Sequence, residues 1–303
     1  MNSPVSLAPV VMFCFTRPDH LARTVESLLR NPEAAATHLT VFCDAARLPA
    51  HRAGVEAVRQ YVASIAGFAS VTRVYRDANL GLARSIIEGV TAALRDNDRV
   101  IVMEDDLVVS PHFLAFMNSA LACYQDDPQV ASIHGYCYPV RTELPPTFFM
   151  QGADCWGWAT WSRAWAHFNP DGRQLLEQLV QRKLTRDFDF DGNYPYTRML
   201  RGQIAGRNDS WAIRWHASCF LREMLTLYPG RSLVENIGND NSGTHCAPTE
   251  VYAGALDPGP VKVERIALEP SAAGRAAFVD FFRSSREGLF QRILRRVVRP
   301  LRR

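Results

Sequence analysis

Apolar runs alternate with helix-patterned segments along the first 135 residues, and this alternation constrains the fold more than any other feature of the sequence. The run 9–16 is continuously apolar until its polar end, as expected of a strand that is buried on both faces. The strand-like segments are 9–16, 39–46, 70–77, 99–106 and 130–137, and the helix-like segments are 17–31, 54–67, 79–97 and 110–127. Repeated units of this kind predict an α/β fold with a mostly parallel, doubly wound sheet flanked by helices.

Two of these helices carry recognisable start signals. Asp19 stands near the beginning of segment 17–31, where an acidic side chain can cap free backbone N–H groups. Ser110 precedes Pro111 at the start of segment 110–127, and proline is common in the first turn of a helix. We therefore expect Asp19 and Ser110 to be N-caps.

The second half of the chain has a different composition. All six tryptophans lie between residues 156 and 215. Trp158, Trp161 and Trp165 stand at helical spacing, which favours a helix there. Segments 139–149 and 247–275 contain several proline or glycine residues and are expected to be irregular.

Composition narrows the class of protein. A net charge of +3 over 303 residues is too small to indicate nucleic-acid binding. The seven cysteines form no C-x-x-C pair, which suits reduced, mostly buried thiols in the cytoplasm. The N-terminus lacks the basic start and apolar core of an export signal, and no apolar run approaches the roughly 20 residues of a spanning helix. We therefore expect a cytoplasmic protein.

Three acids, Glu104, Asp105 and Asp106, follow the apolar run of segment 99–106. In a parallel α/β sheet, ligands bind at the carboxyl ends of strands. On an extended backbone Glu104 and Asp106 would point one way and Asp105 the other. Adjacent carboxylates repel one another, and a hard divalent cation such as Mn²⁺ or Mg²⁺ would relieve that repulsion. A solvated strand end with helix-capping acids is the alternative, and we favour a metal or ligand site.

The segment "VIVMEDDLVVSPHFLAFM" (100–117) resembles the acidic motif of GT-A glycosyltransferases. It is nearest to the N-acetylglucosaminyltransferase I type, which has E-D-D-L before a Pro-x-Phe helix start, and bacterial polysaccharide and lipopolysaccharide glycosyltransferases are similar. The likeness extends over roughly residues 9–246. It implies a metal-dependent enzyme that moves a sugar from a nucleotide sugar, most simply a UDP-sugar, to a glycan or glycolipid with inversion.

The resemblance also implies roles for individual residues. Asp106 matches the metal ligand, and His245, in a later loop, matches a residue that completes the metal or diphosphate site. Asp44 would contact the base, Arg84 would approach the diphosphate, and Glu104 and Asp105 would hold the ribose and the donor sugar. The residues expected to bind the nucleotide sugar are Thr16, Arg17, Asp44, Arg84, Glu104 and Asp105.

The sugar-acceptor side of the resemblance is less complete. Trp156 and Trp158 flank Gly157, and together with Trp211 they are candidates for rings that line the sugar acceptor, although a core role is equally consistent with the pattern. Relatives place an acid beside the first tryptophan of the later helix as the catalytic base. Here Trp211 is followed by Ala212. The remaining candidates for the base are Asp209, Glu235 and Asp240, and Asp209 could instead cap the helix, as could Asn208 or Ser210.

We expect three parts in the chain. Residues 1–140 would bind the nucleotide sugar, 141–275 would bind the sugar acceptor within the same domain, and 276–303 would form a basic amphipathic helix that attaches to an anionic membrane surface. A non-catalytic sugar-nucleotide-binding protein is the alternative function, favoured by the missing acid after Trp211. A sugar nucleotidyltransferase ranks lower, because "FTRPDH" (15–20) has no glycine for a phosphate loop.

Overall fold

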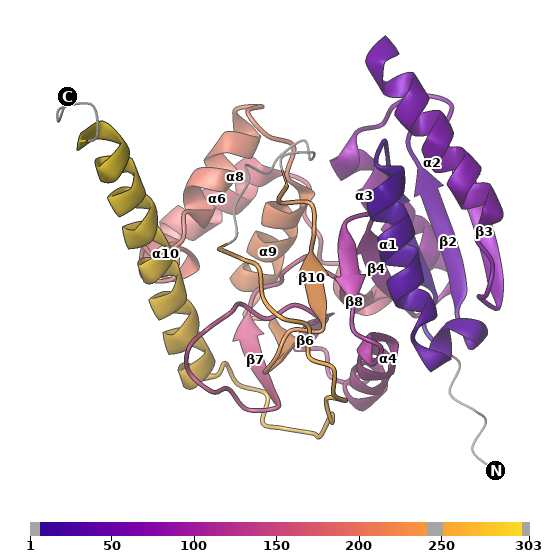
Figure 1. The fold of residues 1–303 in the computed structure, drawn as a ribbon. Coiled ribbons are helices and arrows are strands. Elements are labelled where there is room, and N and C mark those ends of the chain that lie inside the picture. Colours follow the sequence, from indigo (N-terminus) through magenta and orange to yellow (C-terminus); the bar gives the residue numbers. More distant parts are fainter. Residues whose placement is uncertain (1–6, 241–250, 299–303) are drawn as a thin grey trace.

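A computed structural model describes residues 7–240 and 251–298, with side chains up to residue 285 in the last helix. Its centre is an eight-stranded sheet in the order β3-β2-β1-β4-β8-β6-β9-β7 (Figure 1). The strands are β1 (Val10–Cys14), β2 (His38–Cys43), β3 (Ser70–Tyr75), β4 (Arg99–Glu104), β6 (Val130–His134), β7 (Thr147–Gln151), β8 (Trp158–Trp161) and β9 (Leu225–Pro229). This sheet and its flanking helices confirm the predicted α/β class.

The parallel part of the sheet lies in the first half of the chain. β1 pairs in parallel with both β2 and β4, and β2 pairs in parallel with β3. β8 then enters antiparallel between β4 and β6, while β6 pairs in parallel with β9 and β7 lies antiparallel to β9. A separate antiparallel pair joins β5 (Leu107–Val109) to β10 (Val234–Asn236).

Helices cover both faces of the sheet. The helices are α1 (Pro18–Leu29), α2 (Arg52–Ser64), α3 (Leu82–Asp96), α4 (Phe113–Cys123), α5 (Ser162–Trp165), α6 (Gly172–Gln181), α7 (Thr185–Phe188), α8 (Tyr196–Ile204), α9 (Trp211–Leu221) and α10 (Ala272–Val298), with short 3₁₀ turns η1 (Pro32–Ala36) and η2 (Pro49–His51). Alternate residues of β1 serve the two faces. Val10 and Met12 pack with α1, α2 and α4, whereas Val11 and Phe13 pack with α3 and α9.

Two predicted helix caps are wrong. Arg17, not Asp19, occupies the N-cap position of α1, without a side-chain cap, and Asp19 lies in the first turn. The α4 helix begins at Phe113 after His112 rather than at Ser110. The hydroxyl of Ser110 instead donates a hydrogen bond to the carbonyl oxygen of Asp257, 2.8 Å away, and so ties the later loop to the sheet.

The helix predicted from Trp158, Trp161 and Trp165 is also wrong. Trp158 and Trp161 are the two ends of β8, which pairs with β4 on one side and β6 on the other. A spacing of three puts these two rings on opposite faces of a strand, and they accordingly belong to different clusters of the core. Trp165 follows in the short α5 helix.

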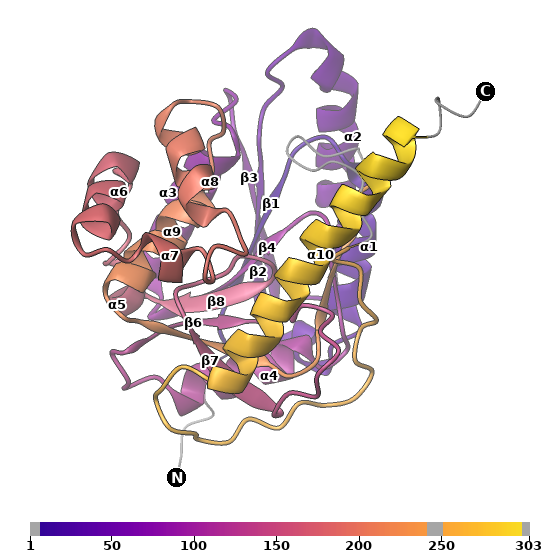
Figure 2. The ribbon, with the colours of Figure 1, turned by 90° about the vertical axis from the view of Figure 1, so that its left-hand side faces the viewer.

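The last helix, α10, starts before the predicted boundary at residue 276 and is partly a core element. Its residues Phe278 and Phe282 are 1% and 2% exposed. Phe278 packs edge-on against Tyr138 and Phe148. Figure 2 shows α10 running across the second half of the molecule. Most of the predicted basic amphipathic helix over 276–303 lies beyond residue 285, outside the described side chains.

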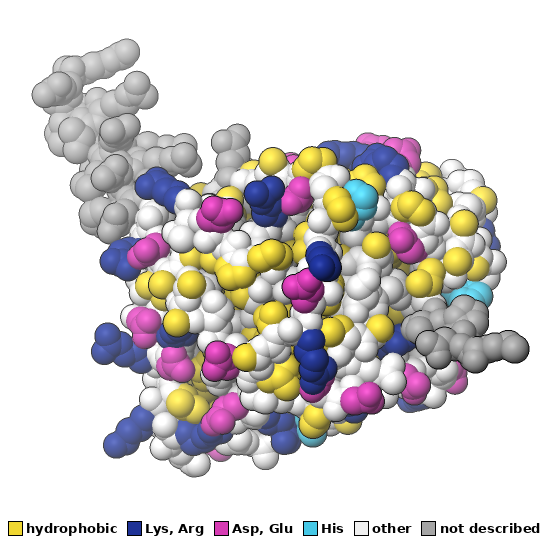
Figure 3. Space-filling view, turned by 90° about the horizontal axis from the view of Figure 1, so that it is seen from below, with side chains coloured by type: hydrophobic (Ala, Val, Ile, Leu, Met, Phe, Trp, Pro, Cys, Tyr) yellow, Lys and Arg dark blue, Asp and Glu magenta, His cyan; other side chains and the backbone are white. Residues whose placement is uncertain are grey.

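Two further expectations concern thiols and surfaces. Cys14, Cys43, Cys123, Cys137 and Cys219 are free thiols, and Cys14 and Cys43 lie side by side on β1 and β2 with their Sγ atoms 3.4 Å apart. Within the described part of the chain, no helix has the length and apolar character needed to cross a membrane. On the face shown in Figure 3, side chains of both charges are interspersed with apolar ones.

Candidate functional site

The three acids lie where β4 ends. Glu104 is the last residue of β4, and Asp105 and Asp106 form a turn before β5. The expectation of an extended backbone through all three acids is therefore wrong. The turn lets Asp105 and Asp106 face the same partner, the guanidinium of Arg17, whose Nη2 contacts Asp105 Oδ1 and lies 2.8 Å from Asp106 Oδ2.

This turn is fixed from two sides. The hydroxyl of Thr24, on α1, donates to the carbonyl oxygen of Asp105 over 2.9 Å. The backbone N–H of Ile237, just after β10, donates to the carbonyl oxygen of Asp106 over 2.9 Å. The acids are thus held between the first helix and the strand pair β5–β10, at the carboxyl end of the central strand.

Burial and mutual repulsion shift the protonation of the acids. Burial, followed by the charges of Asp106 and Asp105, raises the pKa of Glu104 to about 8, and Arg17 opposes this shift only in part. Burial likewise raises the pKa of Asp105 to about 6, opposed by Arg17. One guanidinium therefore does not balance three carboxylates, and the site favours additional positive charge.

Arg17 is itself poised between the acids and an open hydrogen-bonding position. Burial opposes its charge, but Asp105 and Asp106 together raise the pKa of Arg17 above its ordinary value. Its Nη1 atom is buried and has no hydrogen-bond partner among the described residues. Gly238 packs here: a Cβ atom on Gly238 would lie 2.9 Å from Arg17 Nη1 and 2.1 Å from Asp106 Oδ2.

Asp44 lies at the carboxyl end of β2 and already has several protein donors. Its oxygens accept hydrogen bonds from the backbone N–H groups of Leu80 and Gly81, each at 2.9 Å, and from the side chain of Asn79 at 3.0 Å. Gly81 has a φ of +75°, which glycine adopts readily. Asp44 therefore orders the turn before α3 as well as standing beside the predicted nucleotide site.

The other predicted donor-side residues lie around this edge. Thr16 follows β1, and its carbonyl oxygen would lie 2.7 Å from a Cβ atom on Gly54 of α2, so the two elements meet closely there. Arg84, in the first turn of α3, has a 66% exposed side chain and pairs with Glu88 at 2.6 Å. His245 lies outside the described residues.

Two of the three predicted sugar-acceptor tryptophans are core residues. Trp158 and Trp211 are 1% and 3% exposed, and their rings stack with centroids 5.4 Å apart. Their burial argues against a role as open platforms for a sugar. Trp156 is half-buried and lines a cavity of about 210 Å³, together with residues from α8, α9 and the segment before β8.

The predicted candidates for the catalytic base do not converge. Asp209 is 64% exposed on its side chain and pairs with Arg214 at 3.5 Å. Ser210, not Asp209, caps α9 by accepting from the N–H of Ile213. Glu235 lies on β10 opposite Val108, and Asp240 pairs with His20 at 3.1 Å.

Sequence reasoning missed Asp154. Its carboxylate lines the 210 Å³ cavity and accepts hydrogen bonds from the hydroxyls of Tyr138 at 3.0 Å and Tyr228 at 3.4 Å. The available signal was an acid two positions before Trp156 in "GADCWGW" (152–158). That signal was weak, because the tyrosines that hold the carboxylate come from distant parts of the chain.

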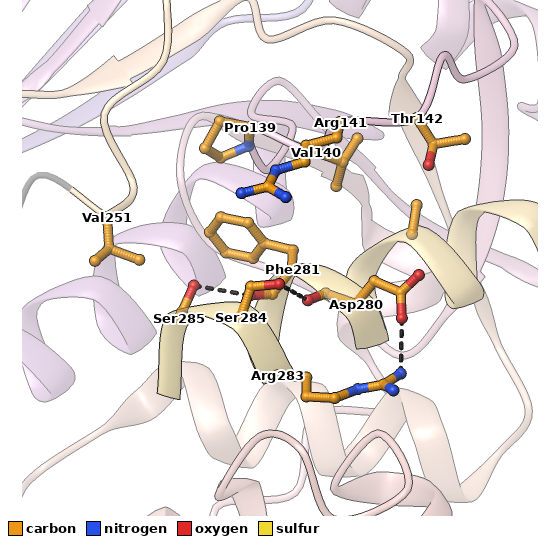
Figure 4. Close-up of a pocket in the computed structure, with 11 residues that line it drawn as sticks. Pro139, Val140, Arg141, Thr142, Val251, Asp280, Phe281, Arg283, Ser284 and Ser285 are labelled. Carbon is orange, nitrogen blue, oxygen red and sulfur yellow. Dashed lines mark hydrogen bonds and ion pairs between the residues drawn. The ribbon is translucent and has the colours of Figure 1, made fainter. Parts of the chain in front are cut away.

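A larger cavity, of about 470 Å³, lies between α10 and residues 139–142. Figure 4 shows Phe281 and Arg141 facing each other across it. Asp280 pairs with Arg283 at 2.7 Å, and the hydroxyls of Ser284 and Ser285 bond to backbone oxygens of α10. This cavity therefore offers no obvious catalytic group.

Comparison with protein families decides the class. Residues 7–164 match the model of the family described as glycosyltransferase like family 2. The chain belongs to this family. It is therefore a transferase of the nucleotide-sugar glycosyltransferase class, as the GT-A resemblance implied.

The family match covers only part of the site of this glycosyltransferase. It includes β1 to β8, Arg17 and the acidic turn, and also Asp154 and Trp156. α9 and β10 lie beyond it, so the far wall of the 210 Å³ cavity is outside the matched range. Among the described residues, no group of three or more His, Cys, Asp or Glu side chains could hold a metal by itself.

Solved structures similar to this glycosyltransferase are distant. A mannosyltransferase from Pyrobaculum calidifontis, in complex with GDP-Man and Mn²⁺, is 15% identical with a TM-score of 0.33, over 59% of this chain and 50% of that one. This chain thus covers half of that mannosyltransferase. A mannose-1-phosphate geranyltransferase from Thermus thermophilus is 14% identical with a TM-score of 0.37, over 77% and 76% of the two chains.

A UDP-glucose pyrophosphorylase complexed with UDP-glucose is 12% identical with a TM-score of 0.36, over 74% of this chain and 90% of the other. Scores this low say nothing about the activity of the present glycosyltransferase. No curated protein sequence matches the chain.

Proposed function

We propose that this glycosyltransferase moves a sugar from a UDP-sugar to a hydroxyl of a glycan or glycolipid, with inversion at the transferred carbon and with a divalent cation at Asp106. The observation that carries the proposal is the arrangement at the carboxyl end of β4. There, Arg17 bridges Asp105 and Asp106 and keeps Nη1 without a partner among the described residues. An arginine beside two carboxylates, with one nitrogen left to donate, suits an anionic ligand that binds together with a divalent cation.

The residues at this turn fit a hard divalent cation. Carboxylate oxygens are the ligands that Mg²⁺ and Mn²⁺ prefer, and Asp106 stands at the mouth of the turn with a 15% exposed side chain. Diphosphate oxygens and water would complete the coordination, since such cations need few protein ligands. A cation bound there would neutralise charge on the diphosphate leaving group.

The protein's own groups have distinct tasks in this proposal. Arg17 Nη1 would donate to a diphosphate oxygen and hold it at the end of β4. Glu104 and Asp105 would accept hydrogen bonds from the ribose and the donor sugar. Residues 1–140 would form this donor half, and residues 141–275 the half that binds the sugar acceptor.

The acidic motif resembles the N-acetylglucosaminyltransferase I type and bacterial polysaccharide glycosyltransferases most closely. We extend the proposal on that basis to a role in cell-surface polysaccharide synthesis. The C-terminal arginines would attach the enzyme to an anionic membrane surface, which suits a lipid-linked sugar acceptor.

A non-catalytic protein that binds sugar nucleotides is the second candidate. The observation in its favour is the first turn of α9, where Ala212 replaces an acid and Asp209 is exposed and paired with Arg214. If Asp209 were the only available acid, the site would bind a donor without activating a sugar acceptor.

Calorimetric titration separates these functions. Wild-type protein is titrated with UDP, GDP and CMP, with and without Mn²⁺, and then incubated with UDP-glucose, UDP-galactose and UDP-N-acetylglucosamine. We expect metal-dependent binding of UDP and slow release of free sugar. Absence of metal-dependent nucleotide binding would contradict the proposal. Binding without any turnover would favour the non-catalytic candidate.

A further inference from the structure

The 210 Å³ cavity lies on the same edge of the sheet as the acidic turn. Trp158 of β8 pairs with Val102 of β4 in antiparallel orientation, so the residues before Trp158 run past the carboxyl end of β4. The N–H of Trp156 donates to His134 Nε2, at the carboxyl end of β6, over 3.1 Å. Asp154 is two residues further along this segment. The cavity is therefore a neighbour of the donor site.

Aromatic rings are the largest side chains in the walls of the cavity. Four tyrosines and one tryptophan line it, from four separate segments: Tyr138, Trp156, Tyr194, Tyr196 and Tyr252. Flat rings with polar edges suit the apolar face of a sugar. A volume of about 210 Å³ lies below the roughly 300–1,000 Å³ of pockets for drug-sized ligands, so the cavity fits one sugar ring rather than a longer glycan.

Two further polar side chains line this aromatic space. One is the carboxylate of Asp154. The other is His216, which is 6% exposed and whose Nε2 is buried without a partner in the described structure. His216 Nδ1 lies 2.7 Å from the carbonyl oxygen of Ala153 and 3.1 Å from its backbone nitrogen, so the backbone already occupies this ring nitrogen. Burial lowers the pKa of His216, so Nε2 of a neutral ring is the nitrogen that is left for a ligand. A ligand with several hydroxyl groups can form hydrogen bonds with both Asp154 and His216.

Asp154 is the one acidic residue among the described residues that line the cavity. Its Oδ2 accepts from the hydroxyl of Tyr138, and its Oδ1 accepts from the N–H of Cys155 at 2.9 Å. Burial raises the pKa of Tyr138 well above its ordinary value, so this hydroxyl remains a donor. The bonds hold the carboxylate in one orientation. By contrast, Asp209 is exposed and already paired with an arginine.

We infer that Asp154 is the catalytic base of this enzyme and that the cavity holds the sugar unit of the acceptor. The inference rests on the proposed function. Asp154 takes the proton of the acceptor hydroxyl as its oxygen attacks C1 of the donor sugar. A new C1–O bond forms, the C1–O bond to the nucleoside diphosphate breaks, and the electron pair of that bond leaves with the diphosphate. His216 Nε2 binds a second hydroxyl of the same ring.

The main test compares Asp154→Asn with wild type and uses Asp209→Asn as the matched control. The readout is release of free sugar from UDP-glucose, UDP-galactose and UDP-N-acetylglucosamine, in which water takes the place of the acceptor hydroxyl. Asp154→Asn should keep UDP binding in the presence of Mn²⁺ and lose about 100- to 10,000-fold in rate. Asp209→Asn should retain the wild-type rate.

A double variant asks whether the carboxylate matters or only the residue's place in the fold. Ala212, in the first turn of α9, also lines this cavity. The double variant Asp154→Asn/Ala212→Asp returns a carboxylate to the cavity from another element. It should recover at least about tenfold of the lost rate, since general-base catalysis depends on the group's position and charge.

A third variant covers the case in which Asp154→Asn does not fold. Tyr138→Phe removes one of the hydrogen bonds that orient the Asp154 carboxylate, so the rate of sugar release should fall about tenfold while UDP binding in Mn²⁺ stays unchanged. Tyr61→Phe, on α2 and outside the cavity wall, serves as the control and should keep the wild-type rate.

The outcomes separate the two proposals. If wild type binds none of the nucleotides, the proposed function fails. If wild type binds UDP and releases sugar but Asp154→Asn or Tyr138→Phe behaves like wild type, the assignment of Asp154 is wrong. Donor binding without sugar release in wild type also overturns it, because a site with a working base activates water.

Discussion

Arg17 is the central residue of the proposed donor site. Its guanidinium holds Asp105 and Asp106 together across the turn after β4, and Glu104 stays outside that pairing. Because Glu104 is not paired with Arg17, the three acids do not form a complete set of ion pairs. A charged ligand can therefore bind there together with a cation without disrupting such a set. The site's geometry depends on close packing by a residue with no side chain, Gly238.

Replacement of Gly238 by alanine tests this packing. The added Cβ would lie 2.1 Å from Asp106 Oδ2, so the carboxylate must leave its position beside Arg17. We expect UDP affinity in Mn²⁺ to fall about tenfold or more, equivalent to about 1.4 kcal/mol, by calorimetry. Gly254→Ala is the control, because its Cβ would meet its nearest atom, on Pro139, at 3.7 Å. Equal affinity in the two variants would contradict the packing argument.

Glu104 should make the stability of the metal-free protein depend on pH. Its pKa is raised from 4.5 to about 8 in the folded state, so the folded protein holds a proton that the unfolded chain has released. The free energy of unfolding should therefore decrease as pH rises through this range, by up to about 1.4 kcal/mol per pH unit.

Urea unfolding of wild type and Glu104→Gln at pH 6, 7 and 8 measures this slope. The window avoids most of the titration of Asp105, whose pKa is about 6. Glutamine resembles the protonated acid, so the variant should lose the decline that wild type shows. The same slope in both proteins would mean that Glu104 is ionised in the fold.

At the level of residues, the sequence predicted the charged residues of the candidate site better than the contacts that these residues make. The acids and Arg17 could be identified because charged residues after an apolar strand are unusual. Asp154 could not, because its tyrosine partners Tyr138 and Tyr228 lie 16 and 74 residues away along the chain. The sequence also did not indicate that Trp158 and Trp211 are core residues, because tryptophan occurs both in protein cores and at sugar-binding sites.

Among the elements, the parallel strands of the first half were predictable and β8 was not. A strand buried on both faces gives a continuous apolar run, as in β1, whereas "WATW" (158–161) is short and continues into helix-like spacing. The antiparallel entry of β8 between β4 and β6 depends on long-range pairing, which local periodicity does not encode. The segment that leads into this strand contains Asp154 and Trp156.

The first half of α10 should contribute to folding as a core element. Phe278 is 1% exposed and packs against Tyr138, Phe148 and Tyr228. Phe278→Ala should lower the free energy of unfolding by about 3–5 kcal/mol, measured by urea denaturation. Arg283→Ala, on the exposed side of the same helix, should change it by about 0.5 kcal/mol or less. A similar small change for both would show that α10 is dispensable for the core.

The molecule as a whole places the donor-side acids and the aromatic cavity along one edge of a single sheet. The donor side comes from the ends of β1, β2 and β4, and the cavity from the segment before β8 together with α8 and α9. The extended α10 packs on the second half (Figure 2) and continues toward the arginine-rich C-terminus.

Membrane attachment is tested on the full chain with vesicles of phosphatidylcholine, with and without phosphatidylserine. We expect co-sedimentation only with the anionic vesicles and loss of binding as salt increases, because arginines near the surface each contribute about 1 kcal/mol. The triple variant Arg295→Glu/Arg296→Glu/Arg299→Glu should abolish it. Equal binding of the triple variant would place the contact elsewhere.

The most direct test of the account is a calorimetric titration of UDP with and without Mn²⁺ for wild type and Asp106→Asn. Asp106 is the acid that we assign to the cation, and the asparagine variant keeps its size. We predict that Mn²⁺ strengthens UDP binding to wild type at least about tenfold, or about 1.4 kcal/mol, and that Asp106→Asn loses this gain. If Asp106→Asn binds UDP and Mn²⁺ as wild type does, the cation is not held at the end of β4 and the account is wrong.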